Sequence, residues 1–400
     1  MAGKSKEALL LDEFREEAFE RFRTGMSNVK DPRRSQGKRY PLQTVLMVLL
    51  LGTVAGANSC QGIETWAREK EEELSPYLDM PHGVPTQDVM LHLLATIDKE
   101  EFSELYAEWV NVCLCTQGKE LDSTHLAIDG KTSRHSYDLK GQKLSVHTLG
   151  VMAVENGILI CQSDCPRKSN EINVIPQILK KLDIRGATIT IDAIAAQTKI
   201  IDEIEKKGGE FIIGVKDNQP KLHEDIMALA KKEKASREAG SNDYHIETEK
   251  AHGRVEQRET YVFRDTSSIR ESKKWENVKA VIMVVRTTTN LNPKDHQAEI
   301  TTDTQYYITN KKDESAEVLG RFIRNHWGIE NKCHWILDVV FKEDDARNRA
   351  GNSAENYAVV RRMALAILKS DTSKLSVNLR RMKAAWNFEY LVGLVGVKKK

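Results

Sequence analysis

The chain has 400 residues, of which 40% are hydrophobic and 30% are charged. This composition is typical of a globular protein, and the length is enough for two or three domains of about 100–200 residues each. Sixty basic and 59 acidic residues give a net charge of +1, so total charge neither favours nor excludes a nucleic-acid partner. The six cysteines are scattered and form no CxxC pair, which excludes a disulfide scaffold and a zinc ribbon and is typical of a reducing compartment.

The most apolar segment of the chain, residues 42–57, contains Gln43, Thr44 and Thr53. It is shorter than the roughly 20 apolar residues that a membrane-spanning helix needs. The first 30 residues carry charges of both signs, unlike a targeting signal. We therefore interpret residues 42–57 as a buried helix and expect no membrane segment.

Residues 1–118 are expected to form an N-terminal helical domain. Leu10, Phe14 and Phe22 lie on a four-residue spacing, and an amphipathic stretch follows at residues 63–77. Residues 80–85 include two prolines and a glycine, which predicts a loop before helix resumes to about residue 115.

From residue 119 the pattern changes to that of a mixed α/β core. Strands are predicted at 123–128, 144–154 and 158–163, with a tight Asn-Gly turn joining the last two. A helix near 171–182, a strand at 187–191, a helix near 195–207 and a strand at 210–215 follow. Three hairpin-linked strands followed by alternating helices and strands predict a mixed sheet covered by helices, in the order of an RNase H-like core.

The core is expected to consist of two parts separated by an insertion. Residues 119–217 form the first part, residues 218–310 are a β-rich insertion, and residues 311–400 return to helix and end in a basic segment. Basic residues are concentrated at residues 361–400, with ten lysines and arginines, and at residues 30–39, with five that include Arg33 and Arg34. Such blocks are able to form a phosphate-binding face, and a solvated surface with a charged tail is the alternative.

Two aspartates stand where predicted strands end. Asp129 follows the apolar residues 126–128, and Asp192 follows the strand 187–191 just before a helix. Reacting groups collect at strand ends in α/β sheets, because the sheet aims them into a crevice. Two carboxylates on neighbouring strands are able to share divalent cations, so we interpret the pair as a metal site rather than as two unrelated turns or helix caps.

A third carboxylate, Glu330, lies between two histidines. On a helix His326, Glu330 and His334 are four residues apart and share one face, beside Trp327. The two histidines are two turns apart, about 12 Å, which is too far for one zinc ion to bind both. A core or coiled-coil face would explain the tryptophans but not the polar residues. We interpret Glu330 as a third metal-facing carboxylate flanked by side chains that contact DNA.

Several short motifs follow one another in order. They are Ala-Ile-Asp-Gly-Lys at 127–131, Lys-Ser-Asn-Glu-Ile at 168–172, Thr-Ile-Asp-Ala at 190–193, Lys-Asp-Asn-Gln-Pro at 216–220 and His-Trp-Gly-Ile-Glu-Asn at 326–331. Together they resemble bacterial insertion-sequence DDE transposases, and most closely the H-repeat-associated, ISAs-type branch. Residues 31–33 and 40–42 resemble the N-terminal domain associated with that branch, so the resemblance spans nearly the whole chain.

The resemblance implies a catalytic triad of Asp129, Asp192 and Glu330 that binds two divalent cations per active site, Mg²⁺ with Mn²⁺ as a substitute. It implies cleavage and strand transfer at the terminal inverted repeats of an insertion sequence, by cut-and-paste transposition. The implied partners are double-stranded DNA, as terminal repeats and as target, and a second copy of the chain, in the bacterial cytoplasm with the nucleoid. No P-loop motif is present, so no nucleotide cofactor is expected.

The chain departs from the wider group around the third carboxylate. A Tyr-Arg-Glu-Lys signature is common there, and the spacing puts Ile323, His326 and Leu337 at its Tyr, Arg and Lys positions. We hypothesise that His326 and His334 take over the DNA contacts.

Further DNA contacts are predicted at strand ends, in the insertion, beside Glu330 and in the N-terminal basic block. They are Lys131, Lys168, Asn170, Lys216, Asn218, His252, Arg254, Arg258, His326, Trp327, His334, Arg33 and Arg34. For the residues at strand ends and in the insertion, the alternative is an ordinary solvated turn, helix terminus or hairpin. Trp327 and Trp335 are able to stack on an unpaired base, although core packing is the expectation for at least one of them.

Three other functions compete with transposition. A domesticated DNA-binding relative is disfavoured because Asp129, Asp192 and Glu330 are all present. A metal-dependent endonuclease without strand transfer shares the first chemical step, so the sequence does not separate it from a transposase. A carboxylate-pair glycosidase would need aromatic residues around the two aspartates, and aromatics make up only 6% of the chain.

Overall fold

A computed structural model describes residues 6–115, 125–137, 144–165, 170–234, 243–251, 254–291 and 298–399. The predicted DNA contacts Lys168 and His252 lie outside the described residues. None of the described helices is both long enough and apolar enough to cross a membrane.

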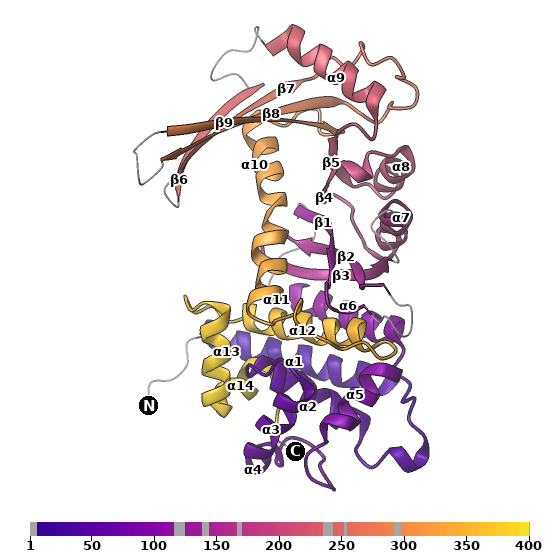
Figure 1. Cartoon of the computed structure of the whole chain (residues 1–400), viewed down its shortest axis with the longest axis vertical. Coiled ribbons are helices and arrows are strands. Elements are labelled where there is room, and N and C mark those ends of the chain that lie inside the picture. Colours follow the sequence, from indigo (N-terminus) through magenta and orange to yellow (C-terminus); the bar gives the residue numbers. More distant parts are fainter. Residues whose placement is uncertain are drawn as a thin grey trace.

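The chain begins with helices, continues with a mixed α/β region and ends with helices (Figure 1). The first helices are α1 (Lys6–Asn28), the 3-10 turn η1 (Ser35–Gly37), α2 (Leu42–Val54), α3 (Cys60–Glu69), α4 (Glu71–Leu74), α5 (Gln87–Thr96) and α6 (Lys99–Cys115). The middle region contains β1 (His125–Thr132), β2 (His147–Ala153), β3 (Ile158–Cys165), α7 (Glu171–Lys181), β4 (Thr188–Ile191), the 3-10 turn η3 (Ala193–Ala195), α8 (Thr198–Lys206), β5 (Glu210–Val215), α9 (Pro220–Glu233), β6 (Tyr244–Ala251), β7 (Arg254–Phe263), β8 (Ala280–Leu291) and β9 (Ala298–Thr309). The last elements are α10 (Ala316–His326), the π-helical segment η5 (Glu330–His334), α11 (Trp335–Val339), α12 (Ser353–Lys369), α13 (Val377–Trp386) and α14 (Phe388–Val395).

The predicted RNase H-like strand order is present in the first half of the sheet. Strand β2 pairs antiparallel with both β1 and β3, whereas β1, β4 and β5 run parallel to one another. The prediction of a mixed α/β fold with hairpin-linked strands followed by parallel ones is therefore confirmed.

The β-rich segment continues the same sheet. Strand β9 pairs antiparallel with β5, and the described strands form one sheet in the order β3-β2-β1-β4-β5-β9-β8-β7-β6. In Figure 1 the strands β6 to β9 form the upper part of the molecule, and α10 descends from them along the core strands. The segment that interrupts the core in sequence is thus joined to it by backbone hydrogen bonds, while the exact domain boundaries stay predictions.

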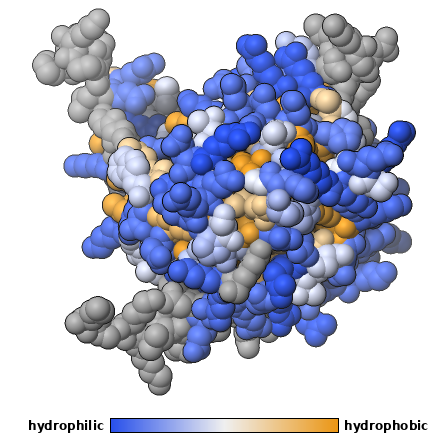
Figure 2. All heavy atoms as spheres, turned by 90° about the horizontal axis from the view of Figure 1, so that it is seen from below, coloured by the Kyte–Doolittle hydropathy of each residue, from blue (hydrophilic) through white to orange (hydrophobic). Residues whose placement is uncertain are grey.

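Helices from both ends of the chain pack together below the sheet (Figure 1). Residues 44–54 of α2 are all buried, and a helix that is apolar on every side has to be enclosed by other elements. Helices α3, α5, α12 and α13 pack around it. Seen from below, this end of the molecule is covered mostly by hydrophilic side chains with small apolar areas between them (Figure 2).

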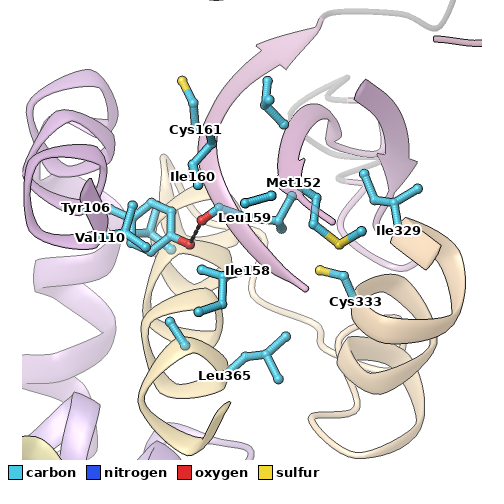
Figure 3. Packing of buried hydrophobic residues seen from close by; sticks show 14 of the residues in the cluster. Tyr106, Val110, Met152, Ile158, Leu159, Ile160, Cys161, Ile329, Cys333 and Leu365 are labelled. Carbon is cyan, nitrogen blue, oxygen red and sulfur yellow. Dashed lines mark hydrogen bonds between the residues drawn. The ribbon is translucent and has the colours of Figure 1, made fainter. Parts of the chain in front are cut away.

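The helical layer is fastened to the sheet at strand β3. Figure 3 shows Tyr106 of α6, whose hydroxyl donates to the carbonyl of Leu159. On the other side of this strand Met152, Ile329 and Cys333 come together, and all three are buried. The segment around Ile329 therefore rests on a core to which both the sheet and the helical layer contribute.

Much of the basic C-terminal block is internal. Arg361, Arg362 and Arg381 are each less than 5% exposed. Arg381 donates to the carbonyls of Thr53 at 2.9 Å and Val340 at 2.5 Å. For these three arginines the expectation of a solvated tail or a phosphate contact is wrong, because all three are buried: Arg381 joins the two ends of the chain, Arg362 pairs with Glu343, and Arg361 lies over the ring of Tyr357.

We expect Arg381→Ala to lower the free energy of unfolding by about 2–4 kcal/mol, because it leaves several backbone carbonyls without their charged donor. Lys383→Ala is the matched control on the same helix. The side chain of Lys383 is exposed and its ammonium lies 4.0 Å from the centroid of the Tyr390 ring, so its loss should cost no more than about 1 kcal/mol. Urea denaturation of the two variants measures the difference, and equal small effects would contradict the structural role of Arg381.

Candidate active site

The parallel pairing of β1 and β4 brings the two predicted aspartates together. Ile128 pairs with Ile191, so Asp129 and Asp192 are neighbours; Asp192 follows β4 as predicted, whereas Asp129 lies within β1 rather than at its end. Oδ1 of Asp129 accepts a hydrogen bond from the N–H of Gly130 at 2.8 Å. Oδ1 of Asp192 accepts from the N–H of Ile194 at 3.1 Å and caps η3, so this aspartate combines a capping role with its position at the strand end.

The predicted turn after Asp129 is wrong, because β1 continues through Gly130 to Thr132 and stays paired with β2. The strand has no room for a side chain at Gly130, where a Cβ atom would lie 2.4 Å from Oε1 of Glu171 and 2.7 Å from Nε2 of His147. These two side chains are buried, and the same two atoms lie 2.6 Å apart beside the strand. The glycine in the Asp-Gly motif thus allows this pair to approach the backbone next to Asp129.

Glu330 begins the π-helical segment, and His334 ends it. Nδ1 of His334 lies 3.0 Å from Oε2 of Glu330 and 3.6 Å from Oδ2 of Asp129. The imidazole is buried, whereas the side chain of Glu330 is 57% exposed. Asp129, Glu330 and His334 each offer one ligand atom, and these atoms lie within 4.8 Å of one another.

The electrostatics of this group fit a divalent cation. Burial raises the pKa of Asp129, against the opposing effects of His334 and the N–H of Gly130, and the carboxylates of Asp192 and Glu171 raise it further. The hydrogen bond from His334 holds the pKa of Glu330 below its usual value. Carboxylate oxygens are typical ligands of Mg²⁺ and Mn²⁺, and an imidazole nitrogen is a common ligand of transition-metal ions.

A single pocket of about 380 Å³ connects the three predicted catalytic carboxylates. Its lining includes Asp129, Asp192, Lys216, His223, Tyr306, His326, Trp327 and Glu330. We call it the carboxylate pocket. It combines a negatively charged end with aromatic rings and one exposed lysine, which suits a ligand with both an anionic group and a planar ring system.

His326 does not share a continuous helical face with Glu330 and His334. Its Nδ1 lies 2.9 Å from Oγ1 of Thr190, which in turn lies 2.7 Å from Nε2 of His125. Burial lowers the pKa of His326 to about 4 and that of His125 to about 3, so both rings are neutral at pH 7. The prediction that His326, Glu330 and His334 share one helical face therefore holds only for Glu330 and His334. The reason is that α10 ends at His326 and the π-helical segment begins at Glu330.

Lys131 is neither a solvated turn lysine nor an exposed phosphate contact. Its side chain is 7% exposed, and its Nζ lies 2.5 Å from Asp338 and 3.6 Å from both Glu343 and Asp344. We call these three carboxylates the acidic cluster. A phosphate contact by Lys131 would have to replace these ion pairs, which tie β1 to α11 and to the segment after it.

Three other predicted DNA contacts lie around the strand ends. Lys216 is exposed in the carboxylate pocket, and the side chain of Asn218 donates to the carbonyl of Ala193 at 2.6 Å, supporting the turn after Asp192. Asn170 precedes α7, and its side chain does not cap that helix.

The predicted contacts in the insertion and the N-terminal block differ in exposure. Arg254 is exposed and pairs with Glu256 at 3.5 Å, whereas Arg258 is held by several glutamates of the neighbouring strand and its own. Arg33 is buried, pairs with Asp31 and donates to a backbone carbonyl, so it stabilises its own loop. Arg34 is exposed.

The expectation that Trp327 or Trp335 packs in the core is wrong. Their exposed fractions are 56% and 54%. Buried residues alternate with them: Ile329, Cys333 and Leu337 face the core instead. Trp327 therefore presents a free aromatic surface at the edge of the carboxylate pocket.

Sequence reasoning missed Thr190 and His125 as parts of the site. A signal for them was present. Thr190 lies two residues before Asp192, and His125 lies four residues before Asp129. Alternate residues of a strand face the same side of the sheet, so each shares a side with its aspartate. The acidic cluster carried no such local signal, since its partner Lys131 is about two hundred residues away in the chain.

Residues 115–367 match the protein family described as Transposase DDE domain, and residues 24–110 match the family described as DDE_Tnp_1-associated. Among curated proteins, the chain is similar to two putative transposases. The H repeat-associated YhhI of Escherichia coli K12 is 32% identical, with 92% of this chain and 96% of YhhI covered. YncI of Escherichia coli O157:H7 is 34% identical, with 90% of each chain covered.

A solved structure of the piggyBac transposase synaptic complex with hairpin DNA also aligns with the chain. The TM-score is 0.44 and the identity 9%, over 97% of this chain and 80% of that one. This likeness is too low to support a conclusion.

We expect Thr190→Val to lower the free energy of unfolding by about 1–3 kcal/mol, because it leaves two imidazole nitrogens without their hydroxyl partner. Thr190→Ser keeps the hydroxyl and should restore most of this loss. Thr188→Val, on the same strand, removes a hydroxyl whose partner Glu210 reaches solvent and should cost less. Thermal and urea unfolding measure the series, and a serine variant no better than valine would argue against the hydrogen-bond chain.

Proposed function

Because the chain belongs to the DDE-domain transposases, as its motifs predicted, we propose that Asp129, Asp192 and Glu330 are its catalytic carboxylates. In this proposal they bind divalent cations, Mg²⁺ with Mn²⁺ as a substitute. The reaction is cleavage of DNA at the terminal inverted repeats of an insertion sequence, followed by strand transfer to target DNA.

One observation carries the assignment. Three carboxylates from separate segments, within β1, directly after β4 and at the start of η5, line one pocket. Each segment is held by its own contacts, so the carboxylates are positioned before any substrate arrives. Burial and the neighbouring carboxylates raise the pKa of Asp129, and the hydrogen bond with His334 lowers the pKa of Glu330. A bound cation would favour the charged form of both carboxylates.

The chemistry needs no covalent enzyme intermediate. Two bound divalent cations would activate the attacking hydroxyl and stabilise the leaving oxygen of a phosphodiester. The residues of this chain hold those cations and position the DNA. Lys216 offers a cation to a phosphate beside the carboxylates, and Trp327 offers a ring on which a base is able to stack, worth about 1–3 kcal/mol.

The proposed partners are double-stranded DNA and a second copy of the chain, which would hold two element ends in one complex. Arg34, Lys216 and Arg254 are the exposed cations among the predicted contacts that the structure describes. Arg33 and Lys131 act inside the protein, so we assign them supporting roles. A DNA endonuclease without strand transfer would use the same pocket, and analysis of joined products separates the two activities.

We expect Asp129→Asn, Asp192→Asn and Glu330→Gln each to reduce Mg²⁺-dependent cleavage of DNA carrying the element ends by at least about a thousandfold, because the groups act as a unit. DNA binding should remain within a few-fold of the unsubstituted chain. Cleavage and binding are measured on the same labelled duplex, with EDTA as the metal-free condition.

Asp303→Asn is the control for this series, since Asp303 lines the same pocket at a distance from the strand ends β1 and β4 and pairs with Arg286. It should cleave DNA within a few-fold of the unsubstituted chain. Full cleavage by Asp192→Asn or Glu330→Gln would exclude the triad. Specific binding without any cleavage by the unsubstituted chain would instead favour a domesticated DNA-binding protein.

We expect Lys216→Ala to weaken binding to all DNA sequences alike and to reduce the slope of log K against log salt by about 1, because one phosphate contact is lost. Lys279→Ala removes an exposed lysine outside the pocket and should leave the slope unchanged. Fluorescence anisotropy between low and physiological salt measures both slopes. Identical slopes would remove Lys216 from the DNA interface.

A further inference from the structure

We propose that His334 is a direct ligand of a metal ion in the carboxylate pocket, so that one cation site combines the oxygens of Asp129 and Glu330 with an imidazole nitrogen. This inference rests on the proposed function, in that it takes the carboxylate pocket to be a metal site. It adds a ligand that a purely carboxylate triad does not contain, and it predicts which metal the site prefers.

The distances suit coordination. Nδ1 of His334 lies 3.0 Å from Oε2 of Glu330 and 3.6 Å from Oδ2 of Asp129. Two ligand atoms on neighbouring vertices of an octahedron with bonds of about 2.1 Å are separated by about 3.0 Å. The imidazole nitrogen thus lies at the ligand spacing from the Glu330 oxygen and somewhat farther from the Asp129 oxygen, and all three atoms lie within 4.8 Å of one another.

The ring is held in place while the carboxylates remain accessible. The side chain of His334 is 7% exposed, compared with 33% for Asp129 and 57% for Glu330. Its neighbours Cys333 and Leu337 are fully buried and anchor the segment on the core. The imidazole therefore forms the floor of the site, and an ion is able to enter from the side where the carboxylates reach solvent.

Glu343, whose Oε2 lies 3.6 Å from Nζ of Lys131, is a carboxylate close enough to His334 to act on its ring. Histidines that bind metals usually donate their second ring N–H to a carboxylate or a carbonyl, which fixes the tautomer. Glu343 is buried and interacts electrostatically with His334. Oε2 of Glu343 lacks a hydrogen-bond partner among the described residues. When Nδ1 binds the metal, the ring proton moves from Nδ1 to Nε2, and the charge of the neutral imidazole is unchanged.

The same contacts would also exist if His334 were only a hydrogen donor to the two carboxylates. The two roles differ in their metal preference. A site with oxygen ligands alone suits Mg²⁺, whereas an imidazole ligand favours Mn²⁺, Co²⁺ or Zn²⁺ over Mg²⁺. Asp192 is outside this three-atom group, so a second cation held by Asp192 would keep oxygen ligands.

The test uses the full chain without DNA, with Mn²⁺ as the probe. Electron spin echo envelope modulation of bound Mn²⁺ detects the ¹⁴N nucleus of a ligating imidazole. We expect ¹⁴N modulation in the unsubstituted chain and its loss in His334→Gln. The same variant should weaken Mn²⁺ binding at least about tenfold and Mg²⁺ binding, measured by competition, by less.

His326→Gln is the matched control, because His326 lines the same pocket but its Nδ1 is bonded to Thr190. It should keep the ¹⁴N modulation. If His334→Gln fails to fold, ¹⁵N-histidine labelling of the variant His223→Gln/His326→Gln replaces it, since His334 is then the remaining histidine among the residues that line the pocket or form the three-atom group, and the modulation must change to that of ¹⁵N.

Bound Mn²⁺ without nitrogen modulation, modulation that persists in His334→Gln, or no specific Mn²⁺ binding at all would each overturn the proposal. The first two outcomes leave the proposed function intact, because Mn²⁺ would then be held by carboxylates or by another histidine. Failure of the proposed function is recognised separately, by DNA cleavage that survives Asp129→Asn and Glu330→Gln.

Discussion

The parallel pairing of β1 with β4 is the constraint on which the site depends. It aligns Ile128 with Ile191, and the two aspartates that follow emerge at one edge of a rigid sheet. Both strands are buried and flanked by further strands, so neither aspartate is able to shift without breaking backbone hydrogen bonds. The sheet thereby holds two like charges close together, an arrangement that is unfavourable by itself and becomes favourable when a cation is bound.

The third carboxylate has to be brought to this edge from a distant part of the chain. Glu330 lies about two hundred residues after Asp129, and several separate contacts fix its segment. Just before it, Nδ1 of His326 is hydrogen-bonded to Oγ1 of Thr190 in β4. Further on, Lys332 donates to the carbonyl of Val154 at 3.2 Å, and the side chains of Ile329, Cys333 and Leu337 enter the core. The helical layer below supports this core, so helices from both ends of the chain help to position Glu330 beside the sheet.

Burial divides the charged residues into two groups that composition does not separate. Lys131, Arg362 and Arg381 lie inside the protein, where they balance Glu343 or saturate backbone carbonyls. Lys216 and Arg254 lie on the surface. Because a buried cation has already replaced its water with protein partners, it has little to gain from a phosphate. The basic blocks of the sequence therefore overstate the surface that is available to DNA.

The sequence by itself determined the strand order of the core, the two aspartates on neighbouring strands and the family, whereas the predicted turn at Gly130 is in fact part of β1. These features follow from local rules: alternation of apolar residues, turn residues and short motifs that one segment contains in full. Only the tertiary structure decided that the β-rich segment continues the core sheet, that Arg381 is internal, that Trp327 and Trp335 are both exposed, and that His326 turns to Thr190 while His334 turns to the carboxylates. Each of these outcomes depends on which distant segment packs against the residue, and the free energy of that packing is a property of both segments together.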